Sequence, residues 1–285
     1  MTLPYETRQR SGLLGDPAAL QRQIECALQL GANPQPLWID DHPIDQGLSV
    51  VLLLIGPQSA KPGHPPVPCL ILNKRSLKVR QPGDICCPGG GIIPKFDRLT
   101  AGLLHFPGTP LRQWGYYRWW RQHAPWSISR LSLLLATALR EAMEEMRLNP
   151  LGVRFQGMLP PEQLVMFNKI VYPLVGWVKR QRRFFPNWEV ARIVRIPISE
   201  LLSPAGYVRL RLQMVAHDKS SSGEDIRDFP AFRDPSAAGD DILWGVTYRI
   251  TMAFLHRVFG FVPPDTLQGP FIEKRLAVDY LTGRP

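Results

Sequence analysis

The sequence lacks the features that mark several large classes of protein. Its four cysteines form no CxxC pair and no zinc-finger spacing, so a structural zinc site is not expected. The longest apolar stretch, SVVLLLIG from Ser49 to Gly56, is far too short to cross a bilayer. The first residues, MTLPYETRQRSGLLGDP, lack the apolar run of a signal peptide. We therefore predict a soluble, cytoplasmic protein with reduced thiols.

Acidic residues are scarce relative to basic ones. The chain has 24 Asp and Glu against 34 Lys and Arg, a formal net charge of +10. This balance favours anionic partners, namely phosphorylated small molecules, nucleic acid or an acidic membrane surface, without choosing among them. At 45% hydrophobic and 20% charged residues, the composition is that of a globular protein. The chain also shows no internal repeat, and we predict one α+β domain with a large insertion.

The pattern along the chain predicts alternating helices and strands. A helix is expected from Asp16 to about Leu30, because Asp16 is a good N-cap and Pro17 suits the first helical position. LSVVLLLIG and PVPCLILNKRS are typical of strands around a turn, and VRFQGML, KIVYPLVGWV and VARIVRIPI follow as further strands. The segments AHDKSSSGEDIRD and RDPSAAGDD indicate polar loops before a last helix in ITMAFLHRVFG.

A helix expected from about residue 128 to 148 carries an unusual group of charges. Glu141, Glu144 and Glu145 fall within five residues, beside Arg140. At about 100° per residue they share an arc of about 140°. The opposite side is an apolar stripe of Leu139, Ala142, Met143 and Met146.

These charges repel one another unless something neutralises them. Arg140 and Glu144 are four apart and can pair, whereas Glu141 and Glu145 form a like-charged pair without relief. A divalent cation would supply that relief, because carboxylate oxygens on one face suit a hard cation. A solvated acidic helix face is the alternative.

Three glycines upstream favour the metal site over the solvated face. In QPGDICCPGGG, Gly89, Gly90 and Gly91 follow a strand-like run. Glycine has no Cβ, so backbone can approach phosphate closely at such a turn. The combination PGGG…REAMEEMRL resembles the Nudix box of the Nudix hydrolases. LNKRSLKVR, QPGDICCPGG, ATALREAMEE and FNKIVYPLVGWV resemble the coenzyme A pyrophosphatase-like branch, so the resemblance runs from about Leu48 to Val262.

The resemblance implies a fold and an activity. The expected fold is a Nudix-type α/β/α sandwich with a mixed central sheet and a large insertion inside the Nudix box loop. It comprises an N-terminal helical extension (1–45), a hydrolase domain (46–262, insertion 98–127) and a C-terminal tail (263–285). The expected enzyme is a pyrophosphohydrolase that uses Mg²⁺ or Mn²⁺ to cleave coenzyme A or a related nucleoside diphosphate derivative. A nucleotide sugar or dinucleotide polyphosphate is the alternative substrate.

The resemblance also assigns roles to residues. Glu141 and Glu145 would bind the metal, and Glu144 would assist the metal or the water, oriented by Arg140. Substrate would bind at Gly89, Gly90, Gly91 and Arg75. Glu189 is either a further ligand or base, or a surface residue.

The sequence departs from the family pattern at several positions. Asp97 stands where the loop of the box usually has an acid, and about thirty extra residues follow it. Arg147 replaces the glycine expected after the helix, so we expect Asn149-Pro150 to end the helix. In the coenzyme A motif, Gln81, Asp84 and Cys87 stand where histidine, glutamine and phenylalanine are usual.

The insertion 98–127 is rich in tryptophan and arginine. It could be a lid that stacks on the nucleotide, a hydrophobic subdomain packed on the core, or a membrane-contacting patch. The expected partner of the protein is a nucleoside diphosphate-type small molecule rather than nucleic acid. From another functional class, a non-catalytic module that binds nucleic acid or membrane is the alternative.

Overall fold

The structure, a computed structural model, describes residues 12–28, 48–59, 63–164, 169–214, 225–234, 241–266, 269–276 and 280. Most of the predicted N-terminal extension and of the two predicted polar loops lies outside these residues. The predicted domain boundaries remain predictions. Within the described part of the chain, every helix is too short or too polar to cross a membrane.

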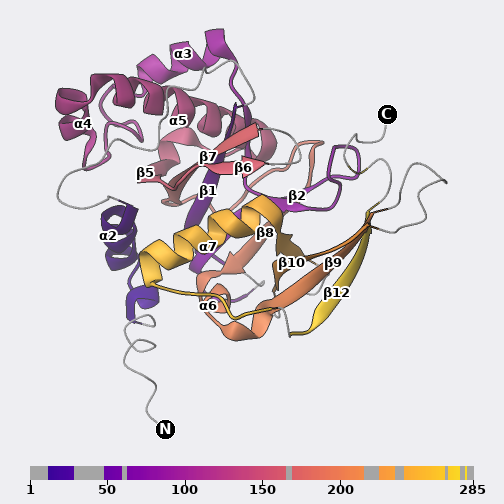
Figure 1. Cartoon of the computed structure of the whole chain (residues 1–285). Helices are drawn as coiled ribbons and strands as arrows, with labels where there is room; N and C mark the ends of the chain where they lie inside the picture. Colours follow the sequence, from indigo (N-terminus) through magenta and orange to yellow (C-terminus); the bar gives the residue numbers. More distant parts are fainter. Residues whose placement is uncertain are drawn as a thin grey trace.

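A mixed eight-stranded sheet forms the centre of the fold (Figure 1). Its main path is β3 (Ile85–Cys86), β2 (Val67–Arg75), β1 (Leu48–Gln58), β7 (Lys169–Val178) and β5 (Val153–Met158). Three more strands pair with this path: β4 (Gly89–Gly91) with β1, β6 (Glu162–Leu164) with β7, and β8 (Val190–Pro197) with β2. β1 and β7 run parallel, and the other pairs in this sheet are antiparallel. The predicted mixed sheet is confirmed.

β1 is buried on both faces, as its continuous apolar sequence predicts. Side chains alternate along a strand, so Val50, Leu52 and Leu54 join one core cluster. Leu53 and Ile55 join the cluster on the other face. The strand therefore separates two hydrophobic layers.

Helices cover both layers, which confirms the predicted sandwich (Figure 1). On one side, α5 (Pro125–Met146) packs with α3 (Pro94–Leu103) and α4 (Tyr117–His123). On the other side lie α2 (Pro17–Leu28), α6 (Ile198–Leu201) and α7 (Gly245–Phe259). The cap predicted for the first helix is present, because the Asp16 carboxylate accepts from the backbone N–H of Ala18 and Ala19 at 2.9 and 3.0 Å.

A second, four-stranded sheet was not predicted. Its order is β11 (Ile242–Trp244), β10 (Asp225–Arg233), β9 (Tyr207–Met214) and β12 (Phe271–Leu276). β10 begins inside a stretch that the sequence analysis assigned to a polar loop, so that assignment is wrong for its first residues. The polar residues there pair across strands: Arg211 Nε of β9 lies 2.9 Å from an Asp228 carboxylate oxygen of β10.

The tryptophan-rich insertion is largely packed on the core. Trp114, Tyr117 and Trp120 are at most 3% exposed and join the cluster that contains β1 and α5. Rings buried in this way cannot stack on a ligand, so the lid hypothesis is wrong for these three residues. The packed-subdomain alternative fits them. Trp126 differs, because 52% of it is exposed.

Candidate active site

The two glutamates predicted to bind metal lie on the last two turns of α5. Leu139 and Met146 bury the helix against the sheet, while Glu141 and Glu145 line a cavity beside β4. The predicted apolar stripe is narrower than expected, because Met143 is 40% exposed. The helix therefore fixes both carboxylates at the border between core and cavity.

α5 ends differently from the prediction. Arg147 is its C-cap and adopts the left-handed conformation, with φ 55° and ψ 39°, and the Leu148 N–H bonds back to the Ala142 carbonyl at 3.3 Å. Asn149 does not end the helix but caps the next short one, its side chain accepting from the Leu151 N–H at 3.1 Å. Arg147 thus takes the conformation that glycine usually supplies.

Arg140 is the buried centre of a charge network. Its Nε donates to Asp97 Oδ1 at 2.8 Å, and its Nη2 donates to the Gly91 carbonyl at 2.9 Å. Nη1 lies 3.2 Å from Glu144 Oε2 and 3.1 Å from Glu141 Oε1. Burial opposes the charge of Arg140, but the hydrogen bonds that Arg140 donates to Asp97, together with the nearby acidic charges, outweigh this effect and raise the pKa of the guanidinium. The expectation that Glu141 has no relief was therefore wrong, and Asp97 is a partner that was not predicted.

Glu145 is the most perturbed acid of the cavity. Its Oε2 accepts a hydrogen bond from Asn73 Nδ2 at 2.7 Å inside the protein. Burial first, and then the charge of Glu141, raises the pKa of Glu145 to about 8, with Arg75 opposing and Glu189 adding to the shift. Burial likewise raises the pKa of Glu141. A proton or a cation is therefore needed to hold these carboxylates together near neutral pH.

Two of the three glycines are required by close approach. A Cβ on Gly90 would overlap the Glu141 carboxylate, and one on Gly89 would overlap the carbonyl oxygen of Val50 in β1. Gly91 has open space where its Cβ would be, and it contributes its carbonyl to Arg140. The glycine turn therefore lets β4 run directly beside the helix acids.

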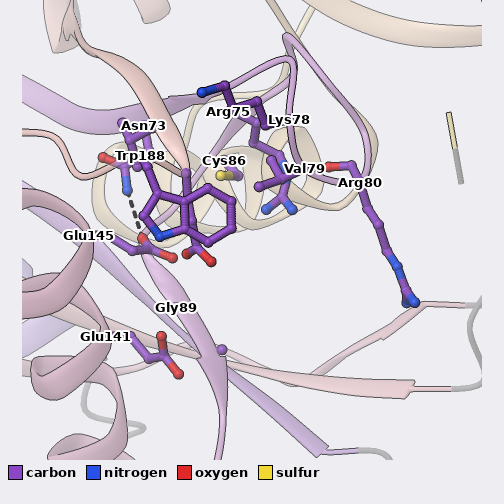
Figure 2. A pocket seen from close by; sticks show the side chains of 13 residues that line it. Asn73, Arg75, Lys78, Val79, Arg80, Cys86, Gly89, Glu141, Glu145 and Trp188 are labelled. Atoms are coloured by element: carbon purple, nitrogen blue, oxygen red, sulfur yellow. Dashed lines mark hydrogen bonds between the residues drawn. The ribbon is translucent and has the colours of Figure 1, made fainter. Parts of the chain in front are cut away.

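A cavity of about 430 Å³ brings these groups together (Figure 2). It contains the predicted site residues Glu141, Glu145, Gly89, Gly90 and Arg75. Three other predicted site residues do not line it: Gly91, Arg140 and Glu144, half of whose side chain is exposed. The remaining lining residues are Asn73, Lys78, Val79, Arg80, Cys86, Trp188, Glu189 and Val190. One wall is therefore acidic and the opposite wall basic.

Backbone hydrogen bonds fix the loop that carries Trp188 and Glu189. The Asn187 N–H donates to the Glu145 carbonyl at 2.9 Å, so the loop is tied to the end of α5. The Glu189 carbonyl accepts from the Ser76 N–H at 2.8 Å, which ties the loop to the segment after β2. Glu189 thus faces the two helix acids as a third carboxylate, and Trp188, 64% exposed, stands at the mouth.

The basic wall is held by the C-terminal part of the chain. The Asp84 carboxylate accepts from Lys274 Nζ at 2.6 Å and from the Tyr280 hydroxyl. The Gln81 N–H donates to the Tyr280 carbonyl at 2.8 Å, and Gln81 itself has a positive φ of 53°. The loop with Lys78 and Arg80 is therefore clamped at its far end. Two positions at which the coenzyme A motif is altered, Gln81 and Asp84, serve this clamp.

The donors of the cavity suit a hard divalent cation. The three carboxylates of Glu141, Glu145 and Glu189 border one space, and the buried Oδ1 of Asn73 has no hydrogen-bond partner in the described structure. Within the described ranges, no three His, Cys, Asp or Glu side chains form a ready-made cage. Mg²⁺ needs none, since it keeps several waters and binds through one or two carboxylates. The residues present therefore fit such an ion.

Sequence reasoning missed several cavity residues. Asn73, Lys78, Arg80 and Trp188 were not singled out, and Glu189 was left open between two roles. The available signal for Asn73 was a polar amide residue directly after the apolar run CLIL of a predicted strand, because a buried amide needs a hydrogen-bond partner. Nothing local to the sequence marks Trp188, because its position depends on the loop that follows β7.

Two curated proteins are similar to the chain. The uncharacterized Nudix hydrolase NudL of Pectobacterium atrosepticum is 29% identical over 150 residues, which are 52% of this chain and 59% of the relative. The protein of the same name from Enterobacter sp. is 29% identical over 153 residues, 53% of this chain and 61% of the relative. The chain thus spans about three fifths of the length of these relatives.

Solved structures with similarity include a NUDIX hydrolase from Nitrosomonas europaea, 13% identical, with 80% of this chain and 81% of that chain covered at a TM-score of 0.38. A MutT/nudix family protein from Enterococcus faecalis is 10% identical, with 91% and 76% covered at a TM-score of 0.38. No family model matches the chain. The names of the two curated relatives support the resemblance to the Nudix hydrolase family and name no branch of it.

Proposed function

We propose that the protein is a metal-dependent hydrolase that cleaves the diphosphate linkage of coenzyme A or of a related nucleoside diphosphate derivative. The observation that carries the proposal is the two-sided cavity. Glu141 and Glu145 line its acidic wall, and Arg75, Lys78 and Arg80 line its basic wall. In Figure 2 the Arg80 side chain extends away from the two glutamates. Arginine and lysine bind phosphate oxygens, and carboxylates bind the cation that bridges them.

Glu141 and Glu145 would hold Mg²⁺ or Mn²⁺, with Glu189 as a further oxygen donor. When bound, the ion neutralises charge on the phosphate oxygens and lowers the pKa of water. Gly89 and Gly90 let the backbone of β4 pass beside the phosphates without a Cβ in the way.

The protein's own side chains would orient the water and take its proton. Water oxygen bonds to one phosphorus, the bond from that phosphorus to the bridging oxygen breaks, and the leaving phosphate keeps the electron pair. The released proton passes to a carboxylate. Glu144, oriented by Arg140 at 3.2 Å, is the acceptor implied by the family resemblance. Glu189, which borders the cavity itself, is the acceptor favoured by position.

Trp188 supports a substrate with a flat ring. Its indole is 64% exposed at the mouth of a cavity whose interior is charged. A nucleobase stacks well on such a surface. We therefore expect the nucleoside part of the substrate to lie over Trp188 and the diphosphate to reach toward Glu141.

The test is a screen of coenzyme A, a nucleotide sugar and a dinucleotide polyphosphate with Mg²⁺ or Mn²⁺, followed by mass spectrometry. In water enriched in heavy oxygen, hydrolysis should place the label on one of the two phosphate products. Glu145→Gln should lower turnover by about a hundredfold or more. Glu273→Gln removes an equivalent charge from an exposed position on β12 and should leave turnover unchanged.

The possible results separate the functional classes. Cleavage of a nucleotide sugar or dinucleotide polyphosphate in preference to coenzyme A would keep the reaction and change the substrate. Equal turnover in wild type and Glu145→Gln would refute the metal assignment. Binding of these compounds without cleavage under either metal would identify a non-catalytic module.

A further inference from the structure

The outward face of α3 is apolar. Asp97 and Ala101 bury the helix against α5, while Phe96, Leu99 and Leu103 are 48%, 69% and 55% exposed. At about 100° per residue, these three side chains fall within an arc of about 60° on the side away from α5. The side of α3 that faces away from α5 thus exposes an apolar stripe to solvent. Figure 1 shows α3 at the outer edge of the helical layer formed with α4 and α5.

Three further large apolar side chains are exposed in the neighbouring segments. Ile93, directly before α3, is 49% exposed, Phe106, just after it, is 62% exposed, and Trp126 at the start of α5 is 52% exposed. Single exposed apolar residues are common on protein surfaces, but a group of six in one short region marks an interaction surface. We call the six residues the α3 patch: Ile93, Phe96, Leu99, Leu103, Phe106 and Trp126.

The stretch of sequence that carries the α3 patch is basic. Residues 92–130 contain a single acid, Asp97, which is fully buried and paired with Arg140. The same stretch contains six basic residues: Lys95, Arg98, Arg112, Arg118, Arg121 and Arg130. The stretch that carries the patch therefore has an excess of positive charge.

A hollow at the edge of the patch has the chemistry of a phosphate site. It holds about 380 Å³ between α3 and the start of α5, and Arg98, His105, Ser129 and Arg130 line it. The Arg130 guanidinium lies 5.6 Å from the ring centroid of Trp126, which also borders the hollow. Arg98 and Arg130 thus lie beside Trp126 of the α3 patch.

We propose that the α3 patch docks the protein on an anionic lipid bilayer. Leu99 and Leu103 enter the boundary between headgroups and acyl chains, while Lys95 and Arg98 contact headgroup phosphates. A second copy of the chain fits less well, because a two-fold interface centred on α3 would bring Lys95 and Arg98 of one copy close to the same side chains of the other. No residue of α3 lines the cavity of the candidate active site.

The experiment is co-sedimentation of the full chain with vesicles. One set contains equal parts of phosphatidylglycerol and phosphatidylcholine, and the other contains phosphatidylcholine alone. We expect salt-sensitive binding to the first set only. The double variant Leu99→Ser/Leu103→Ser should bind at least about tenfold more weakly, and Lys95→Gln/Arg98→Gln should also bind more weakly.

Leu151→Ser is the matched control, because Leu151 is 61% exposed on a different surface element. It should bind as wild type does, and thermal unfolding should show that every variant is folded. Absence of binding to both vesicle sets, or undiminished binding by the Leu99→Ser/Leu103→Ser variant, overturns the proposal. So does a wild-type dimer that this variant dissociates without any vesicle binding, which would assign the patch to a second copy. RNA binding without vesicle binding would overturn it in favour of a nucleic-acid surface.

Discussion

At the residue scale, Glu145 makes the stability of the metal-free protein depend on pH. Burial, reinforced by the charge of Glu141, raises the pKa of Glu145 from 4.5 to about 8. A carboxyl with a higher pKa in the folded than in the unfolded state stabilises the fold fully below the unfolded pKa. That contribution is lost as pH rises through the folded pKa. The Tm in chelator should therefore fall as pH rises from about 5 to about 9.

Glu145→Gln isolates this contribution, because the amide does not ionise. Across the same range its Tm should fall less than that of wild type, and at the alkaline end the variant should be the more stable protein. Glu273→Gln, exposed on β12, should follow wild type. Parallel Tm curves for wild type and Glu145→Gln would show that Glu145 ionises normally.

Arg147 offers a second test at this scale. It holds a left-handed conformation at the end of α5, which costs an L-residue about 1–2 kcal/mol. Glycine avoids this cost but loses about 0.5–1 kcal/mol through the greater freedom of its unfolded chain. Arg147→Gly should therefore stabilise the protein by about 0.5–1 kcal/mol, measured by urea unfolding. Arg147→Ala keeps the strain, and an equal gain in that variant would contradict the explanation.

At the scale of elements, the Arg140–Asp97 pair connects α5 to α3. Both side chains are buried, and the 2.8 Å contact is supported by the Gly91 carbonyl and the hydroxyl of Thr137. α3 is thereby attached to the helix that carries Glu141 and Glu145, the acids proposed to bind metal. The family pattern places an acid near this position, and the structure gives that acid a structural role.

Removal of the Arg140 side chain should destabilise the protein, because the buried Asp97 carboxylate then has no counter-charge. Arg140→Ala should lower the free energy of unfolding by about 3–5 kcal/mol, since a buried carboxylate loses its counter-charge. Asp97→Asn should destabilise wild type yet stabilise the Arg140→Ala protein, where it removes the uncompensated charge. A double-variant cycle by urea unfolding measures this reversal. If the two effects simply add, the residues do not act as a pair.

The features predicted correctly from the sequence are those that depend on residues close together in the chain. β1 followed from an unbroken apolar run, and the cap at Asp16 from the residues beside it. The partners at the site could not be read in this way. Asp97 lies 43 residues before Arg140, and Asn73 lies 72 residues before Glu145. The second sheet was missed because its β10 strand is rich in charges that ion pairs across the sheet satisfy.

At the scale of the whole molecule, the C-terminal part of the chain shapes the candidate active site. β12 pairs with β9. Lys274 of β12 and Tyr280 beyond it bind the Asp84 carboxylate, and the Tyr280 carbonyl accepts from the Gln81 N–H. The loop that carries the basic wall of the cavity is thus fastened by residues near the opposite end of the sequence. The hydrogen bonds that fasten this loop do not involve α5.

Tyr280→Phe tests this fastening. Loss of a hydrogen bond of about 1 kcal/mol should raise KM about fivefold for the cleaved diphosphate, with little change in kcat. Hydrogen exchange should become faster in residues 76–84. Tyr207→Phe is the control, because its hydroxyl donates to the Leu201 carbonyl at 2.6 Å away from the cavity. That variant should lose Tm without a change in KM; equal KM values in all three proteins would rule the fastening out.

The parallel pairing of β1 with β7 also governs how the chain folds. Leu52 pairs with Leu174, so roughly 120 residues must be enclosed before the central ladder can close. Closure entropy grows only with the logarithm of loop length, so the thirty extra residues add only about 0.2–0.3 kcal/mol to that cost. Contacts so distant in sequence form slowly. Pairing of β1 with β7 should therefore be the rate-limiting step of refolding. We expect α5 and the helices of the insertion to form before this step.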